Sequence, residues 1–335
     1  ALAAALLPTL RERYRIEIET HAVPPPDAIA APDATRLAAW AERDARRCAQ
    51  RLGLSGYDPS PEGLATDAAA LRRGAMMRTR LGHYQGAMFC FEGEWYWGID
   101  RLHHLEARLT QAGLRKEPEH EPLYPPPRVS SAHSAAPTTV DLARARRLTF
   151  FCSLRSPYTY LAVDRVRALA ASYGATLELA FVLPMVMRGL PVNQAKRLYI
   201  VRDAKREAER LNLPFGDIAD PVGLPTERGL AVLNHAIAAG CGPDFLESFL
   251  RGVFAEGIDA GSQRGLQRIA HRAGMDWAAV TRALDDPSWR TLAQQHRDRM
   301  QHLGLWGVPS FQVDDRPGLW GQDRLFMVEQ DLAAA

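Results

Sequence analysis

The chain has 335 residues, a length typical of two domains of ordinary size. Hydrophobic residues make up 47% and charged residues 24%, and 41 basic side chains nearly balance 39 acidic ones. This composition indicates a globular protein with buried cores and argues against a nucleic-acid or membrane surface built on charge. No apolar run approaches the roughly 20 residues of a membrane span and no secretion signal is evident, so we expect a cytoplasmic protein.

The four cysteines are scattered, with no C-x-x-C pair. They are Cys48, Cys90, Cys152 and Cys241. This spacing is not that of a disulfide framework or a zinc site, so we expect reduced thiols, most of them buried, and no bound metal. His103 and His104 occupy adjacent positions of a predicted helix and should point to different faces, which disfavours a metal pair there.

The first predicted domain covers residues 1–115. Its opening segment has a helical apolar pattern that gives way to alternation at Ile16 and Ile18, which predicts a helix followed by a strand. Residues 116–145 contain the run EPEHEPLYPPPRVSSAHSAAPTT, without apolar periodicity. Because consecutive prolines favour extended polyproline II, this segment is predicted to be a semi-rigid linker.

The segments on either side of this linker resemble each other. RDARRCAQRLGL at 43–54 matches RDAKREAERLNL at 202–213, and YWGIDRLHHLEARL at 96–109 matches LWGQDRLFMVEQDL at 319–332. An internal repeat of this kind predicts two related domains. The first copy lacks nearly all of the helical stretches found at about 214–290, so we expect it to be reduced.

The second copy opens with a strand at 147–154, followed by a helix from Pro157 and a strand around 177–179. This order is the start of a parallel βαβ unit. Near the end of the chain, alternation around a turn at 314–318 predicts a β-hairpin, and a last helix follows from Asp323.

Ser156 precedes Pro157 at the predicted start of that first helix. Both residue types are common at these positions, so the pair is typical of an ordinary helix cap. The same position lies at the positive end of the helix dipole, which stabilises an anion such as a thiolate. With no His–Asp set evident to deprotonate Ser156, we interpret its hydroxyl as a hydrogen-bond donor to a ligand thiolate, with the cap as the alternative.

Two further motifs follow. Pro309 begins a strand and is by default an edge or turn residue, but a cis bond would turn the Val308 backbone outward, ready to pair with an extended peptide. Gln322 and Asp323 begin the last helix, where they could hold a charged end of a ligand or, for Asp323, simply cap the helix.

Taken in order, the motifs SPYT (156–159), GVPSF (307–311) and WGQDR (320–324) make the chain resemble the DsbA-like thioredoxin superfamily. It is most similar to the branch of kappa-class glutathione transferases and 2-hydroxychromene-2-carboxylate isomerases, over about residues 146–332 and more faintly over 1–114. The resemblance implies an α/β, thioredoxin-like fold with a helical insertion over residues 146–335, preceded by a second, reduced thioredoxin-like lobe.

The resemblance also implies roles for single residues. A serine, here Ser156, replaces the first cysteine of the oxidoreductases and engages the sulfur of glutathione. Val308, before the cis-proline match Pro309, pairs with the peptide part of glutathione, and Asp323 with Gln322 holds the γ-glutamyl end. The implied site is Ser156, Pro157, Tyr158, Asn193, Lys196, Val308, Pro309, Gln322 and Asp323. Asn193 and Lys196, which match an Asn and a Lys of the family, are also residue types common on a helix surface.

The resemblance therefore implies an enzyme that binds glutathione, or a similar thiol, and isomerises or conjugates an apolar, aromatic small-molecule electrophile. A thiol–disulfide oxidoreductase is an alternative, but Ser156 and Thr159 stand at the usual cysteine positions, which leaves Cys152 or an external thiol. A non-enzymatic module that binds peptides by strand addition near Pro309 is a second alternative.

The first copy lacks the implied site. An ungapped alignment sets Ala87 opposite Pro309, and the SPYT equivalent would fall before Ala1. We therefore expect a non-catalytic lobe. Because members of the family are usually dimers, the resemblance implies either an intramolecular pseudo-dimer or a homodimer.

Overall fold

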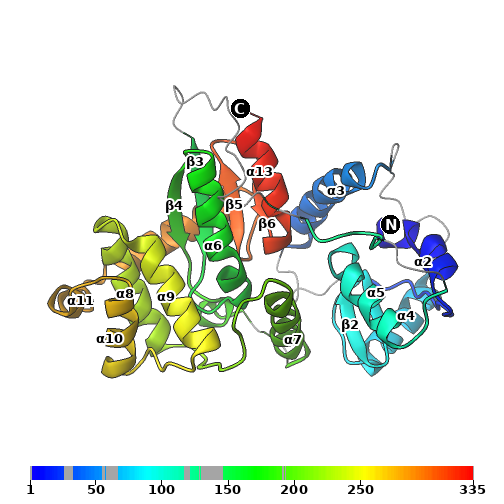
Figure 1. Cartoon of the computed structure of the whole chain (residues 1–335), viewed down its shortest axis with the longest axis horizontal. Coiled ribbons are helices and arrows are strands. Elements are labelled where there is room, and N and C mark those ends of the chain that lie inside the picture. The colour runs from blue at the N-terminus through cyan, green and yellow to red at the C-terminus, as the bar shows by residue number, and fades with distance from the viewer. Residues whose placement is uncertain are drawn as a thin grey trace. The chain divides into compact units, whose positions relative to one another are not determined.

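The computed structural model describes residues 2–25, 33–54, 57, 67–116, 121–127, 129, 146–190, 192 and 194–334. The chain divides into two compact units (Figure 1), and each is described by itself. The first comprises Ala1–Pro126 with Val192–Tyr199, and the second comprises Pro127–Pro191 with Ile200–Ala335. Most of the predicted linker lies outside the described residues.

The first unit combines helices with one β-hairpin. Its helices are α1 (Leu2–Ala5), α2 (Leu7–Arg13), α3 (Ala34–Arg51), α4 (Ala68–Arg80) and α5 (Leu102–Gln111). Strands β1 (Met88–Phe91) and β2 (Glu94–Trp97) pair antiparallel, and the 3₁₀ helix η1 (Ile99–Arg101) leads into α5. Glu92 and Gly93 both have positive φ, 49° and 79°, as a two-residue hairpin turn of the mirror-image type requires.

The strand predicted around Ile16 and Ile18 does not form. After α2, Tyr14 makes a single antiparallel bridge with Arg115, and residues 16–25 have no regular structure. Tyr14 is 1% exposed, and its hydroxyl donates a hydrogen bond to Glu106 Oε1 at 3.4 Å. The hydrogen bond to Glu106 of α5 therefore fixes the start of this segment at Tyr14. The prediction was wrong because alternation becomes a strand only where a neighbouring strand can pair with it.

The second unit contains a four-stranded sheet of order β4-β3-β5-β6 (Figure 1). Its strands are β3 (Arg147–Cys152), β4 (Thr176–Phe181), β5 (Ser310–Val313) and β6 (Leu319–Trp320). β3 is parallel to β4 and antiparallel to β5, which is antiparallel to β6. Cys152 lies opposite Phe181 and Phe151 opposite Ser310. The ends of β3 and β4 and the beginning of β5 therefore share one edge of the sheet.

Helices connect these strands. α6 (Pro157–Ser172) is the crossover between β3 and β4, and α13 (Leu325–Ala333) follows β6 through the 3₁₀ helix η3 (Gln322–Arg324). The segment between β4 and β5 contains the 3₁₀ helix η2 (Met185–Arg188), α7 (Gln194–Arg210), α8 (Leu224–Ala238), α9 (Gly242–Ala255), α10 (Gln263–Arg272), α11 (Trp277–Ala283) and α12 (Ser288–His302). Helix in this region thus extends beyond the predicted 214–290. In the part of the chain that the structure describes, no helix is both long and apolar enough to cross a membrane.

The core of the second unit lies along β3. Every residue from Leu148 to Cys152 is buried, and the ring of Phe150 stacks on Phe311 of β5 with centroids 5.4 Å apart. Central strands of a sheet are expected to be mostly apolar, and the one polar residue in this run, Thr149, donates a hydrogen bond to Glu178. This rigid centre fixes the sheet edge on which the residues of the predicted site are gathered.

Candidate functional site

Ser156 occupies the N-cap of α6. Its backbone is extended (φ −101°, ψ 111°), and its Oγ accepts a hydrogen bond from the Thr159 N–H at 3.1 Å. Pro157 is buried at the first helical position. The cap that the sequence predicts is therefore formed, and because the cap uses Ser156 as an acceptor, its hydroxyl proton remains to be donated.

That proton points toward the start of β5. The Ser156 Oγ donates to the Val308 carbonyl oxygen at 3.4 Å, across a sequence separation of 152 residues. Ordinary O–H···O bonds are about 2.7–2.8 Å long, so this contact is weak and leaves the hydroxyl able to turn to a better acceptor. The Val308–Pro309 bond is cis, the alternative that the motif raised.

Trp320 packs against the backbone just before Val308. A Cβ at Gly307 would overlap the Trp320 ring, so glycine is needed for this close approach. The Trp306 and Trp320 rings meet edge-on with centroids 4.7 Å apart. The Gly321 N–H donates to the Pro309 carbonyl oxygen at 2.9 Å, which joins the WGQDR motif to the strand start.

Gln322 lies at the beginning of η3 and is 1% exposed. Its Oε1 accepts a hydrogen bond from Arg165 at 2.6 Å, and its Nε2 donates to Glu207 Oε2 at 3.0 Å and also to the carboxylate of Asp323. The side chain of Gln322 is thus engaged by protein groups and orients Asp323, which is half-buried.

Charged groups around Gln322 compensate one another. Glu207 is 1% exposed and accepts hydrogen bonds from Arg210 at 2.8 and 3.2 Å. Burial, followed by the nearby Arg210, lowers the pKa of Arg165 to about 10, while the carboxylates of Asp323 and Glu207 oppose this shift. Arg165 therefore stays charged at neutral pH, as a partly buried cation can when carboxylates face it.

Tyr158 connects α6 with α7. Its hydroxyl donates to Asp203 Oδ2 at 2.7 Å, and Asp203 is fully buried. The ring packs against a buried apolar cluster that includes Leu161. This fixes the direction in which α6 leaves the N-cap at Ser156.

For two residues of the predicted site, this geometry assigns no role. Asn193 lies outside the described residues. Lys196 lies in the first turn of α7, in the segment that groups with the first unit. Their roles stay predictions.

Cys152 ends β3, four positions before the N-cap serine, and is fully buried. Burial raises the pKa of its thiol. All four cysteines are free; Cys48 is also buried, Cys241 is partly buried and Cys90 is exposed. Because the thiolate is the reactive form, Cys152 is a poor nucleophile where it lies.

Sequence reasoning missed Arg165, Glu207 and Arg210. The latter two belong to the charged segment RDAKREAERLNL, which has the pattern of a solvated helix face. The one signal in this segment was its match to RDARRCAQRLGL in the internal repeat. A repeat does not show that a carboxylate is buried.

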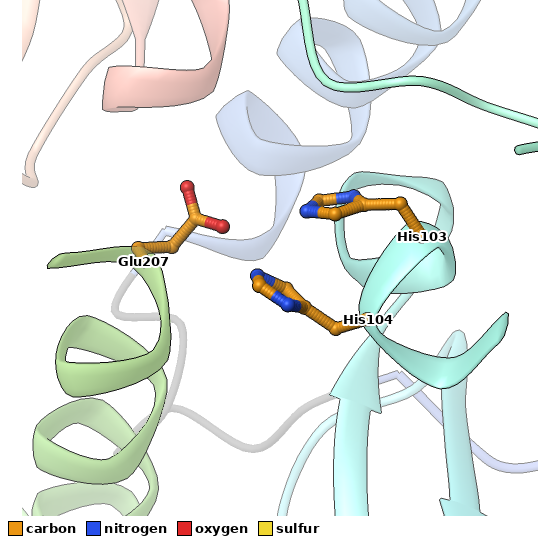
Figure 2. A group of neighbouring side chains, drawn as sticks. All are labelled: His103, His104 and Glu207. Atoms are coloured by element: carbon orange, nitrogen blue, oxygen red, sulfur yellow. The ribbon is translucent and has the colours of Figure 1, made fainter. Parts of the chain in front are cut away.

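His103 and His104 belong to α5 in the first unit (Figure 2). Their ring centroids are 4.1 Å apart, so the expectation that adjacent positions would separate the rings was wrong: the two side chains bend toward each other. Glu207, the third side chain labelled there, belongs to the second unit and to the Gln322 contacts described above. Two imidazoles alone are fewer ligands than zinc takes from a protein, so the pair is not assigned as a metal site.

Comparisons with known proteins cover the second unit. The family model described as the DSBA-like thioredoxin domain matches residues 147–333. The 2-hydroxychromene-2-carboxylate isomerase of Pseudomonas putida is 25% identical over 192 residues, 54% of this chain and 91% of the relative. The enzyme of the same name from Pseudomonas sp. (strain C18) is 25% identical over 198 residues, 56% and 90% of the two chains.

Solved structures of low similarity include a 2-hydroxychromene-2-carboxylate isomerase, 22% identical, with a TM-score of 0.48 over 56% of this chain and 94% of the other. The cytosolic disulfide reductase DsbM from Pseudomonas aeruginosa, solved with GSH, is 19% identical with a TM-score of 0.40 over 56% and 96%.

Proposed function

Because the chain belongs to the DSBA-like thioredoxin domain family, we propose that its second unit binds glutathione, or a similar thiol, and isomerises or conjugates an apolar, aromatic electrophile. The observation that carries the proposal is the 3.4 Å approach of the Ser156 hydroxyl to the Val308 carbonyl oxygen beside Pro309. The relatives named 2-hydroxychromene-2-carboxylate isomerase support isomerisation as the reaction.

The residues present fit a bound thiol. Ser156 has a hydroxyl proton held only by a long contact, and it stands at the N-terminus of α6, where the helix dipole favours negative charge. The half-buried Val308 offers main-chain groups to an extended peptide. The carboxylate of Asp323, held by Gln322, suits an ammonium group.

Bound in this place, the thiol supplies a sulfur nucleophile. Ser156 donates a hydrogen bond to the negative charge on sulfur, and the start of α6 adds its partial positive charge, so both favour the ionised form. Ser156 itself is not assigned as the nucleophile, because its Oγ contacts the Thr159 N–H and the Val308 carbonyl oxygen, and an amide N–H cannot remove its proton.

The burial of Cys152 favours this role for a bound thiol over disulfide exchange by the chain itself. The cysteine nearest in sequence to the N-cap is Cys152, which is buried and has a raised pKa. Exchange starts from an accessible thiolate and is normally resolved by a second cysteine. Thr159, in the first turn of α6, takes no part in such chemistry and is itself buried.

We also propose that the first unit is a reduced, non-catalytic copy of the thioredoxin-like domain. Each unit contains a β-hairpin followed by a 3₁₀ helix and an α-helix, formed by β1, β2, η1 and α5 or by β5, β6, η3 and α13. Gly98 and Gly321 precede the 3₁₀ helices with positive φ of 53° and 101°, and Asp100 and Asp323 hold the same position within them. A role for this unit as a built-in partner stays a prediction.

The test is calorimetric titration of the full chain with glutathione. We expect Ser156→Ala to weaken binding about tenfold, the effect of losing one hydrogen bond to a charged group. Ser262→Ala is the matched control, because Ser262 caps α10 by accepting from the Gly265 N–H in the same way but lies outside the site. Absence of binding to the wild type would refute the proposal. Unchanged binding in Ser156→Ala would refute the role of Ser156.

A further inference from the structure

The β1–β2 hairpin of the first unit repeats the β5–β6 hairpin of the second in its backbone bonds. The Gly98 N–H donates to the Ala87 carbonyl oxygen at 2.8 Å, and the Gly321 N–H donates to the Pro309 carbonyl oxygen at 2.9 Å. Counted from these bonds, β1 pairs with β2 in the same register as β5 pairs with β6. β1 therefore has in the first unit the position that β5 has in the second.

Residues 17–22 have the position of β4. A Cβ at Gly74 on α4 would overlap the Ala22 carbonyl oxygen. In the second unit, the Nδ1 of His296 on α12 lies 3.0 Å from the carbonyl oxygen of Phe181, the last residue of β4. Both contacts are made at the same position counted from the end of the helix, and a glycine with positive φ, 79° or 77°, follows each helix. Residues 17–22 thus pack against α4 as β4 packs against α12.

Within the described parts of the first unit, no strand corresponds to β3. In the second unit, β3 lies between β4 and β5 and is bonded to both. In the first, the described strands make a sheet of β1 and β2 alone, and no backbone hydrogen bond between described residues joins 17–22 to β1. The place of a central strand is therefore open on two sides.

Burial shows the effect of this difference. All four residues of β5 are buried, whereas three residues of β1 are half-buried and Cys90 is exposed. Composition does not explain the contrast, because β1 has the sequence MFCF and β5 has the less apolar sequence SFQV. An apolar strand with an open edge favours the addition of another strand.

The open edge of β1 also presents main-chain groups. In an antiparallel pair, residues alternate between those that bond to the partner strand and those whose N–H and C=O point to the opposite edge. Because Ala87 bonds to Gly98, Met88 and Cys90 direct these groups away from β2. Met88 has the position of Ser310, which pairs with β3 in the second unit.

We propose that the first unit binds an extended segment of a partner polypeptide as a β-strand, antiparallel to β1 and parallel to residues 17–22. The inference rests on the proposed relation between the two units. The segment takes the position of β3, whose residues from Leu148 to Cys152 are all buried, so it is apolar on both faces. A second copy of this chain is not the source, because its β3 is already bonded on both edges.

The experiment titrates the full chain with a fluorescently labelled peptide of residues 146–153, RRLTFFCS, that carries Cys152→Ser. We expect the wild type to raise its anisotropy and to leave that of a scrambled peptide unchanged. Cys90→Pro should weaken binding about tenfold, because it removes an N–H at the open edge and leaves the bonds between β1 and β2 in place. Cys90→Ser keeps that N–H, so it is the matched control and should bind as the wild type does.

A second arm leaves the protein unchanged. In the second unit the Asp314 N–H donates to the Arg147 carbonyl oxygen, so Thr149, two residues further along β3, also faces β5. N-methylation of the peptide at Thr149 should therefore weaken binding about as much as Cys90→Pro. Hydrogen exchange should show that the unmodified peptide protects residues 17–23 and 88–91.

No binding to the wild type, equal binding of the scrambled peptide, or an affinity that survives both Cys90→Pro and N-methylation would overturn the inference. Protection confined to the second unit would also overturn it, and protection of 88–91 without 17–23 would refute in addition the relation between the units. Protection of 88–91 that grows with protein concentration in the absence of peptide would assign the edge to a second copy of the chain and overturn the choice of partner. Peptide binding by a chain that does not bind glutathione would refute the proposed function of the second unit and support this inference. Thermal unfolding shows whether each variant is folded.

Discussion

The hydroxyl of Ser156 lies 3.4 Å from the carbonyl oxygen of Val308. The N-cap of α6 therefore faces the backbone that leads into β5. The cap supplies a donor and the positive end of α6, and the strand supplies main-chain groups for pairing. The helix N-terminus favours an anion, and the main chain beside it can pair with a peptide. A peptide that carries a thiolate, such as glutathione, has both features.

A cysteine placed at the N-cap of α6 should be reactive. We expect Ser156→Cys to introduce a thiol with a pKa below the usual value of about 8.5, because the helix dipole stabilises its thiolate. Thiolate absorbance at 240 nm against pH measures this pKa. Ser262→Cys, at the cap of α10, is the matched control for the helix dipole alone. A pKa at or above 8.5 in Ser156→Cys would contradict an anion-stabilising site.

Replacement of Gln322 by leucine should destabilise the second unit. Gln322→Leu removes the acceptor of the partly buried Arg165 and a donor to the buried Glu207, and leaves both charged groups without that partner. We expect a loss of about 2–4 kcal/mol in the free energy of unfolding, measured by urea titration. Gln294→Leu changes an exposed glutamine whose amide donates to the carboxylate of Asp298 and should cost about 0.5 kcal/mol or less. A similar effect of the two changes would argue against the buried network.

The first unit should lose stability in mild acid through His83. This imidazole is 6% exposed and lies among the rings of Tyr84, Trp95 and Tyr199. Burial, followed by the charge of Arg78, lowers its pKa to about 4 from 6.5. The unfolded chain therefore takes up the proton first as the pH falls, and the stability that the neutral ring provides above pH 6.5 is lost progressively down to pH 4.

The contribution of His83 over this window should be about 3 kcal/mol, from the size of the shift. It can be measured by urea titration at each pH, as the difference in the pH dependence of the unfolding free energy between the wild type and His83→Phe. If the two proteins lose stability in parallel between pH 6.5 and 4, the ring is not held neutral by burial.

The two cysteines at opposite extremes of exposure should differ in alkylation. We expect iodoacetamide to modify the exposed Cys90 in the native chain and to spare the buried Cys152. Burial raises the pKa of both thiols, so access of the reagent to the sulfur decides the difference. Mass spectrometry of the digested protein gives the extent at each site, and alkylation in denaturant provides the full-reaction control. Rapid native modification of Cys152 would revive disulfide exchange as a function for this chain.

Local sequence signals were enough to predict several elements of the second unit. The serine–proline cap, the proline before β5 and the Asp323 turn each depend on a few adjacent residues, and all three are found where the motifs placed them. Their order along the chain also identified the DSBA-like family, which the match over residues 147–333 confirms.

Two features could not be read in the same way: the absence of a strand at Ile16, and the burial of charged side chains, complete for Glu207 and partial for Arg165. A strand requires a neighbour, and a charge on a helix is solvated or buried according to what packs against it from elsewhere in the chain. Caps and turns are decided by bonds between near neighbours in sequence, whereas pairing and burial are decided by groups that only folding brings together.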